Sequence, residues 1–128
     1  MLVITLGKAG DRFRSSLDRR SAGKLVGIYQ AGAGNDVMRL GSERIALADA
    51  GPGRDLVVGG PLKDAINGGP GKDRLEGGLG NDGIDALDGV SDLVLCGPDR
   101  DRARVDPKDR VRGCERVVRH RRGRVLSQ

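Results

Sequence analysis

Four aspartates recur at a constant interval in the middle of the sequence. Asp55, Asp64, Asp73 and Asp82 are each nine residues apart, and each ends a six-residue segment that contains glycine. Carboxylate oxygens are hard ligands that suit calcium, and aspartates in glycine-containing turns also cap those turns by side-chain hydrogen bonds. The interval therefore indicates either a row of cation ligands or a row of turn caps.

The aspartates belong to four consecutive nine-residue blocks over residues 50–85, AGPGRDLVV, GGPLKDAIN, GGPGKDRLE and GGLGNDGID. Two positions after each aspartate stands an aliphatic residue, namely Val57, Ile66, Leu75 and Ile84. This pattern predicts a six-residue turn followed by a three-residue strand whose middle side chain points inward. A short fixed period of this kind is typical of a solenoid, in which each repeat stacks on its neighbours.

These blocks resemble the RTX (repeats-in-toxin, hemolysin-type) nonapeptide, glycine-glycine-x-glycine-x-aspartate-x-aliphatic-x. The resemblance implies an all-β fold, a right-handed parallel β-roll, with calcium as its bound ion and no catalytic residue. A weaker copy, AGAGNDVMR, begins at Ala31 and contains Asp36 and Met38, and GKAGDRF begins at Gly7. Downstream, the register continues without most of its glycines through Asp92, Asp101 and Asp109, with Val94, Ala103 and Val111 at the inward position.

In that family two blocks form one coil, and each ion lies between turns stacked on the same side. The resemblance therefore pairs Asp55 with Asp73 and Asp64 with Asp82. It also pairs Asp36 with Asp55 and Asp73 with Asp92, at 19 rather than 18 positions. It further implies that backbone oxygens of the turns complete the metal sites, at Gly51, Gly53, Gly59, Gly60, Gly68, Gly69, Gly71, Gly77, Gly78 and Gly80.

Two departures from the motif lower the expected calcium affinity. Leu62 stands where the fourth-position glycine belongs, and a positive φ there would cost an L-residue about 1 kcal/mol or more. Arg54, Lys63 and Lys72 directly precede aspartates, where their positive charges would oppose cation binding unless they point outward.

Cys96 and Cys114 are 18 residues apart, which equals one coil of two nonapeptides. Adjacent rungs of a parallel sheet lie about 4.8 Å apart, within the Cα range of about 4.4 to 6.8 Å that a disulfide tolerates. A disulfide between them is the favoured interpretation, and two free buried thiols remain an alternative. A zinc site is disfavoured because the chain adds only one histidine to these two cysteines.

Composition restricts the other function classes. Aromatic residues make up 2% of the chain, so neither a core of large rings nor a base-stacking surface is available. Residues 51–95 carry eight acids and four bases, whereas residues 96–128 carry eleven Arg or Lys and five acids. The basic C-terminal region suggests an alternative as a polyanion-binding protein, with nucleic acid unlikely to be the partner.

His120 lacks a neighbouring nucleophile, and GxSxG and HExxH motifs are absent, so we do not expect an enzyme.

We expect one domain over residues 1–128. Its parts are wider first coils (1–30), calcium-type repeats (31–92), degenerate rungs stapled by the disulfide (93–115) and a basic tail (116–128). The tail sequence also suggests a final strand or short helix that closes the open end of the roll.

The expected disulfide and weak calcium sites favour an extracellular or cell-surface location, since both suit an oxidising, calcium-rich compartment. A solenoid that folds without metal is the closest competing interpretation, and no stretch is long and apolar enough for a transmembrane segment.

Overall fold

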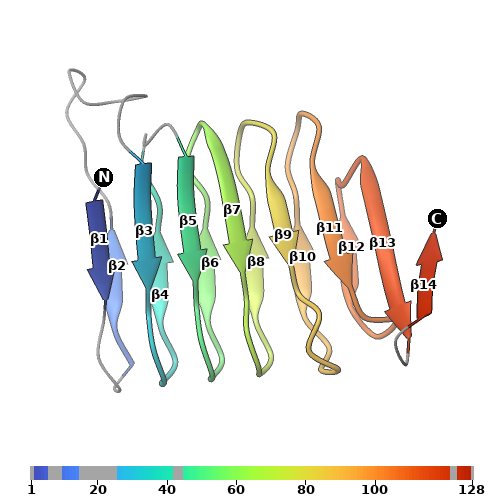
Figure 1. Ribbon diagram of the computed structural model, residues 1–128, viewed down its shortest axis with the longest axis horizontal. Helices are drawn as coiled ribbons and strands as arrows, with labels where there is room; N and C mark the ends of the chain where they lie inside the picture. Colours follow the sequence, from blue (N-terminus) through green and yellow to red (C-terminus); the bar gives the residue numbers. More distant parts are fainter. Residues whose placement is uncertain (1, 6–9, 15–25, 42–44, 122–123, 128) are drawn as a thin grey trace.

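Two parallel sheets face each other along the length of the protein (Figure 1). The computed structural model describes residues 2–5, 10–14, 26–41, 45–121 and 124–127. Sheet A contains β1 (Leu2–Thr5), β3 (Val26–Gln30), β5 (Ile45–Asp49), β7 (Lys63–Asn67), β9 (Gly83–Asp85), β11 (Arg102–Val105), β13 (Arg116–Arg121) and β14 (Arg124–Ser127). Sheet B contains β2 (Arg12–Arg14), β4 (Val37–Arg39), β6 (Leu56–Val58), β8 (Arg74–Glu76), β10 (Leu93–Leu95) and β12 (Arg110–Arg112).

From β1 to β13 successive strands alternate between the two sheets, so the chain winds as a solenoid. In Figure 1 the sheet A strands other than β14 run downward in front and the sheet B strands run upward behind, while the chain advances from left to right. This winding is right-handed, as the resemblance implied. The central coils take 18 or 19 residues each, whereas the first takes 25. Within the described part of the chain no helix could span a membrane.

The core between the sheets is a thin ladder of aliphatic side chains. On sheet B, Val57 pairs in register with Leu75, and Leu75 with Val94. On sheet A, Ile66 stacks on Ile84 in the same way. All five side chains are buried, because strand residues alternate between the two faces and the middle residue of each short strand points inward. The inward positions predicted from the sequence are therefore confirmed, along with Met38 and Ala103, and Val111 is partly buried.

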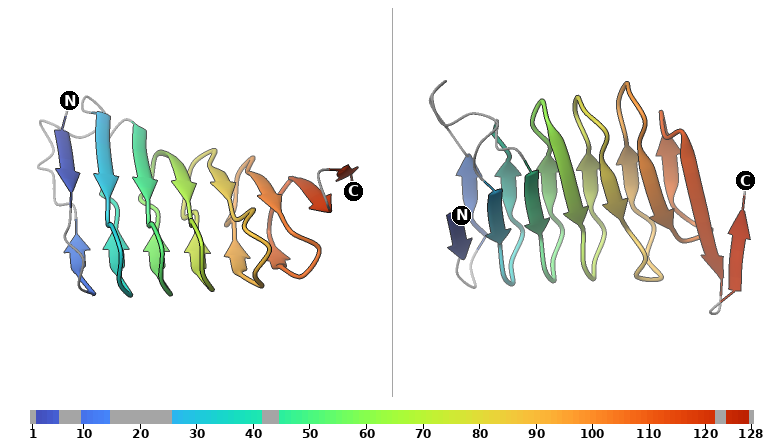
Figure 2. Two further views of the ribbon diagram at one scale, coloured as in Figure 1. Left: turned by 60° about the horizontal axis from the view of Figure 1, so that its bottom comes forward. Right: turned by 45° about the horizontal axis from the view of Figure 1, so that its top comes forward.

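The turns form two edges, visible at the bottom and top of the roll (Figure 2). The turns that precede sheet B strands are called the first edge, and they lie at residues 31–36, 50–55, 68–73, 86–92 and 106–109. The second edge is the set that precedes sheet A strands, at residues 59–64, 77–82 and 96–101. Glycine is required where these turns stack: Gly71 has a φ of 114°, and a Cβ there would clash with the carbonyl oxygen of Gly53.

The C-terminal end of the roll is covered by two strands. β13 pairs in parallel with β11, and β14 then pairs with β13 in antiparallel orientation. Of the alternatives raised for the basic tail, the closing strand is therefore the one that the structure contains over residues 116–121. The side chain of His120 lies outside the described part.

Candidate metal centre

Aspartates stack in a continuous row along the first edge. The backbone N–H of Asp36 donates to Oδ1 of Asp55 at 2.7 Å, and that of Asp55 donates to Oδ1 of Asp73 at 2.8 Å. The same contact joins Asp73 to Asp92 and Asp92 to Asp109, both at 2.7 Å. The structure therefore brings together the first-edge aspartates that the sequence paired.

A shorter row lies on the second edge. The backbone N–H of Asp64 donates to Oδ1 of Asp82 at 2.8 Å, and that of Asp82 donates to Oδ1 of Asp101 at 2.7 Å. Asp64 and Asp82 are thus adjacent, as predicted. Asp101 extends the row, although it lies among the degenerate rungs of residues 93–115 and was not expected to be a calcium ligand.

One oxygen of most row carboxylates is buried without a hydrogen-bond partner. The Oδ2 atoms concerned belong to Asp36, Asp55, Asp73, Asp82, Asp92 and Asp101, whose residues are at most 3% exposed. Leaving a buried carboxylate oxygen unpaired costs free energy, because the water that solvated it in the unfolded chain is not replaced. A backbone hydrogen bond from the preceding coil accounts for Oδ1 of these carboxylates, and a cation would account for Oδ2.

The electrostatics of both rows favour a bound proton or a bound cation. Burial raises the pKa of Asp73 and of Asp82 from the ordinary 3.8 to about 8, and repulsion from neighbouring aspartates adds to the effect. Burial likewise raises the pKa of Asp92 to about 7 and that of Asp55 to about 6, while backbone hydrogen bonds lower both. A metal ion would supply the positive charge that these carboxylates lack.

The turn glycines line the same rows. A Cβ added at Gly68 would lie 2.9 Å from Oδ2 of Asp73, and a Cβ added at Gly77 would lie 2.9 Å from Oδ2 of Asp82. The unpaired oxygens thus lie over the first glycine of their own turns. Gly51, Gly53, Gly68, Gly69 and Gly71 belong to the first edge, and Gly59, Gly60, Gly77, Gly78 and Gly80 to the second.

The turn that contains Leu62 differs from the expectation. Leu62 does not adopt a positive φ; among the described non-glycine residues only Asp99 does, at 80°. Instead the turn changes conformation: Gly60 and Leu62 lack the positive φ of Gly78 and Gly80, which hold the same positions in the next block, and β7 begins early, at Lys63. Here the N–H of Gly60 donates to Oδ2 of Asp64 at 2.9 Å, so this aspartate caps its own turn.

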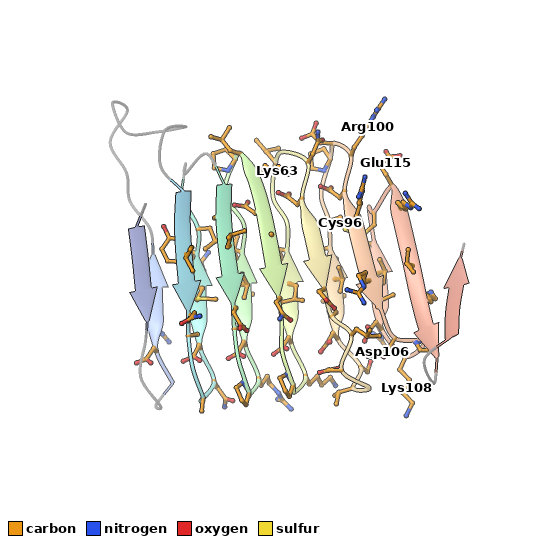
Figure 3. All side chains as sticks on the ribbon, in the orientation of Figure 1. Lys63, Cys96, Arg100, Asp106, Lys108 and Glu115 are labelled. Atoms are coloured by element: carbon orange, nitrogen blue, oxygen red, sulfur yellow. A yellow bond between two sulfur atoms is a disulfide. The ribbon has the colours of Figure 1, made fainter. Side chains whose placement is uncertain are left out.

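The cations that precede the aspartates do not pair with them. Arg54, Lys63 and Lys72 are exposed, and none forms an ion pair with a described carboxylate. Arg54 and Lys72 line a groove of about 630 Å³ that runs along the first edge and also borders Asp55 and Asp73. In Figure 3 Lys63 likewise extends from the second edge.

One carboxylate of the first edge was missed in the sequence. Asp88 lies in the turn of residues 86–92, and one carboxylate oxygen from each of Asp73, Asp88 and Asp92 lies within 4.8 Å of the others. Asp106, labelled in Figure 3, supports this turn by accepting hydrogen bonds from the N–H groups of Asp88 and Gly89. The signal available in the sequence was the step of ten rather than nine residues from Asp82 to Asp92.

The predicted disulfide is present. Cys96 and Cys114 are bonded with a Cα–Cα distance of 5.0 Å and a sequence separation of 18. The bond therefore joins neighbouring coils at the C-terminal end, as the coil length predicted. Cys96 is fully buried and packs with the aliphatic ladder.

Residues 49–84 match the family model of the RTX calcium-binding nonapeptide repeat in four copies. These four blocks are RTX repeats, which confirms the resemblance for this part of the chain. The repeat is a structural, calcium-binding repeat and does not define an enzyme family. No curated protein and no solved structure matches the chain in the two other comparisons.

Proposed function

We propose that this protein is a secreted structural or interaction module in which calcium ions between stacked turns complete the folding of the β-roll. The observation that carries the proposal is the set of buried aspartate oxygens without partners along both edges. Calcium takes six to eight oxygen ligands, and stacked turns offer carboxylates together with the carbonyls of their glycines. The ligand set proposed is the one that the sequence analysis named, with Asp88 added.

Metal binding and folding are coupled in this proposal. The aspartates approach one another only when the coils stack, so the sites do not exist in the unfolded chain. Without a cation, the stacked carboxylates repel one another or retain protons, and the thin core of mostly small aliphatic residues offers limited compensation. Calcium removes this repulsion, so its binding free energy contributes to folding.

The location proposed is outside the cell. Disulfides persist in oxidising compartments, and extracellular calcium is abundant enough to fill sites with dissociation constants of about 0.1 to 1 mM. The disulfide between Cys96 and Cys114 and the RTX repeats both suit that environment.

A metal-independent solenoid is the competing function class, and one observation favours it. Within the rows, Oδ1 of an aspartate accepts a backbone hydrogen bond from the preceding coil, as from Asp55 to Asp73 and from Asp64 to Asp82, and this stabilises the stack without a metal. That interpretation leaves the buried Oδ2 atoms of Asp36, Asp55, Asp73, Asp82, Asp92 and Asp101 without a role, whereas calcium binding assigns them one.

The experiment that separates the two is far-ultraviolet circular dichroism of the calcium-stripped, disulfide-intact chain during calcium titration, with magnesium as the control ion. We expect a transition from coil to β structure that is selective for calcium. An unchanged β signal would favour the metal-free solenoid and refute calcium-driven folding.

A matched pair of variants links that transition to the rows. Asp55→Asn removes one buried carboxylate and should raise the calcium midpoint about tenfold, or 1.4 kcal/mol. Asp49→Asn removes an exposed one whose hydrogen bond to the N–H of Gly51 an amide can replace, as Asn67 does for Gly69 one coil later. Equal midpoints for the two variants would argue against the aspartate rows as the binding sites.

A further inference from the structure

The turn of residues 86–92 has lost the leading glycines of the motif and closes in another way. Ala86 and Leu87 replace the first two glycines. The N–H groups of Asp88 and Gly89 both donate to Oδ2 of Asp106, at 2.8 and 2.6 Å, and the N–H of Val90 donates to Oδ1 of Asp88 at 2.8 Å. These bonds fix the backbone and one oxygen of Asp88, while its Oδ2 is buried without a partner.

Three unpaired carboxylate oxygens occur in the same place. Asp73 and Asp92 are 3% and 2% exposed, and Oδ2 of each has no hydrogen-bond partner. One oxygen from each of these residues and one from Asp88 lie within 4.8 Å of one another. Two oxygens that bind the same calcium ion at about 2.6 Å can be at most about 5.2 Å apart, so the observed separation fits a shared ion.

Among the described residues, this is the group in which carboxylate oxygens of three residues lie within 4.8 Å of one another. The stacking contacts elsewhere in the rows join two aspartates, as in Asp55–Asp73 and Asp64–Asp82. Described Lys and Arg side chains form ion pairs only with Glu76 and Asp85, so no described cation pairs with the group.

We propose that Asp73, Asp88 and Asp92 form a three-carboxylate calcium site that binds more tightly than the other sites and fills first. Asp88 supplies the additional ligand, taking a place that glycine carbonyls hold in a regular repeat. The inference rests on the proposed calcium-binding function. Calcium affinity rises with the number of charged ligands and with the rigidity of the site, and the hydrogen bonds around Asp88 supply that rigidity.

The test is isothermal titration calorimetry of the calcium-stripped, disulfide-intact full chain with calcium chloride. We expect the wild type to bind one ion at least about tenfold more tightly than the rest. Asp88→Asn keeps the oxygen that accepts from Val90 but removes the charge, and it should lose that tight class while retaining the weaker sites. Asp49→Asn, an exposed acid on β5, serves as the control for a change of one charge.

The outcomes separate the two claims. If the wild type binds several ions and Asp88→Asn matches Asp49→Asn, the three-carboxylate site is refuted and the proposed function stands. If the wild type binds no calcium, both fail.

A second measurement needs no variant and so does not depend on Asp88→Asn folding. In ¹H–¹⁵N spectra of the wild type, the first equivalent of calcium should affect the amides of Asp73, Asp88 and Asp92 before those of Asp36 and Asp82, whose N–H groups donate to carboxylates outside the proposed site. An initial change at Asp36 or Asp82 would overturn the proposal.

Discussion

The four matched repeats and the coils that follow them stack the same buried aspartates but build their turns from different residues. Over residues 49–84 most turns are closed by glycines with positive φ, and the coils hold together without covalent links. Over residues 86–115 Asp99 takes the positive φ of a fourth-position glycine, Asp88 and Asp106 close another turn, and a disulfide joins two coils. The comparison shows that the aspartate and the inward aliphatic residue define the coil, whereas different residues can form the turn.

Removing the disulfide should cause the largest loss of stability, because it replaces the stabilisation that regular turns give elsewhere. Closing a loop of this length is worth about 3 kcal/mol in the chain-entropy model, so the Cys96→Ser, Cys114→Ser double variant should lose about that much stability. Urea unfolding in saturating calcium measures it. A loss below about 1 kcal/mol would mean that the C-terminal coils are held by their turns alone.

Replacing a glycine in the regular repeats should cause the next largest loss of stability. Gly71→Ala puts a Cβ against the Gly53 carbonyl at a strained φ and should cost about 2 kcal/mol. Gly83→Ala is the control, because an added Cβ there meets nothing within 4 Å. Thermal unfolding in calcium compares the two, and equal stability would show that the central turns tolerate side chains as the C-terminal ones do.

The pH dependence should reverse when calcium is added. The pKa values raised to about 6 at Asp55 and about 8 at Asp73 and Asp82 mean that the calcium-free folded chain holds protons more tightly than the unfolded chain. Its stability is therefore highest below about pH 4 and falls as the pH rises through 6 to 8. With calcium, deprotonation exposes the ligands, so affinity rises over the same range.

The free energy of unfolding at pH 4.5, 6 and 8, measured with and without calcium, gives the slope of stability against pH in each condition. Parallel slopes would contradict the assignment of these carboxylates as ligands.

The smallest effect is expected at the irregular central turn. Leu62→Gly should allow the positive φ seen in the other turns and raise calcium affinity at the Asp64–Asp82 pair a few-fold, while stability changes by about 1 kcal/mol or less. Calorimetry of this variant beside the wild type provides the measurement. Unchanged affinity would show that the turn conformation around Leu62 does not limit binding.

The nine-residue period was sufficient to predict the β-roll, the inward ladder and the stacking of Asp55 on Asp73, because spacing alone determines register in a solenoid. It could not locate Asp88, since a one-residue insertion can be absorbed anywhere in a turn and only packing against Asp106 decides where. Nor could it foresee that the turn at Leu62 would change its conformation rather than accept strain. Both depend on contacts between coils, which a linear repeat does not encode.

The central claim is that calcium lies between stacked turns, bound by the aspartate rows. A crystal structure of the calcium-loaded chain, with anomalous scattering used to locate calcium, tests it most directly. We predict anomalous peaks between successive turns of the first edge, beside Asp55, Asp73 and Asp92, and between Asp64 and Asp82 on the second. An ordered β-roll grown in millimolar calcium with no peak beside any of these aspartates would contradict the account.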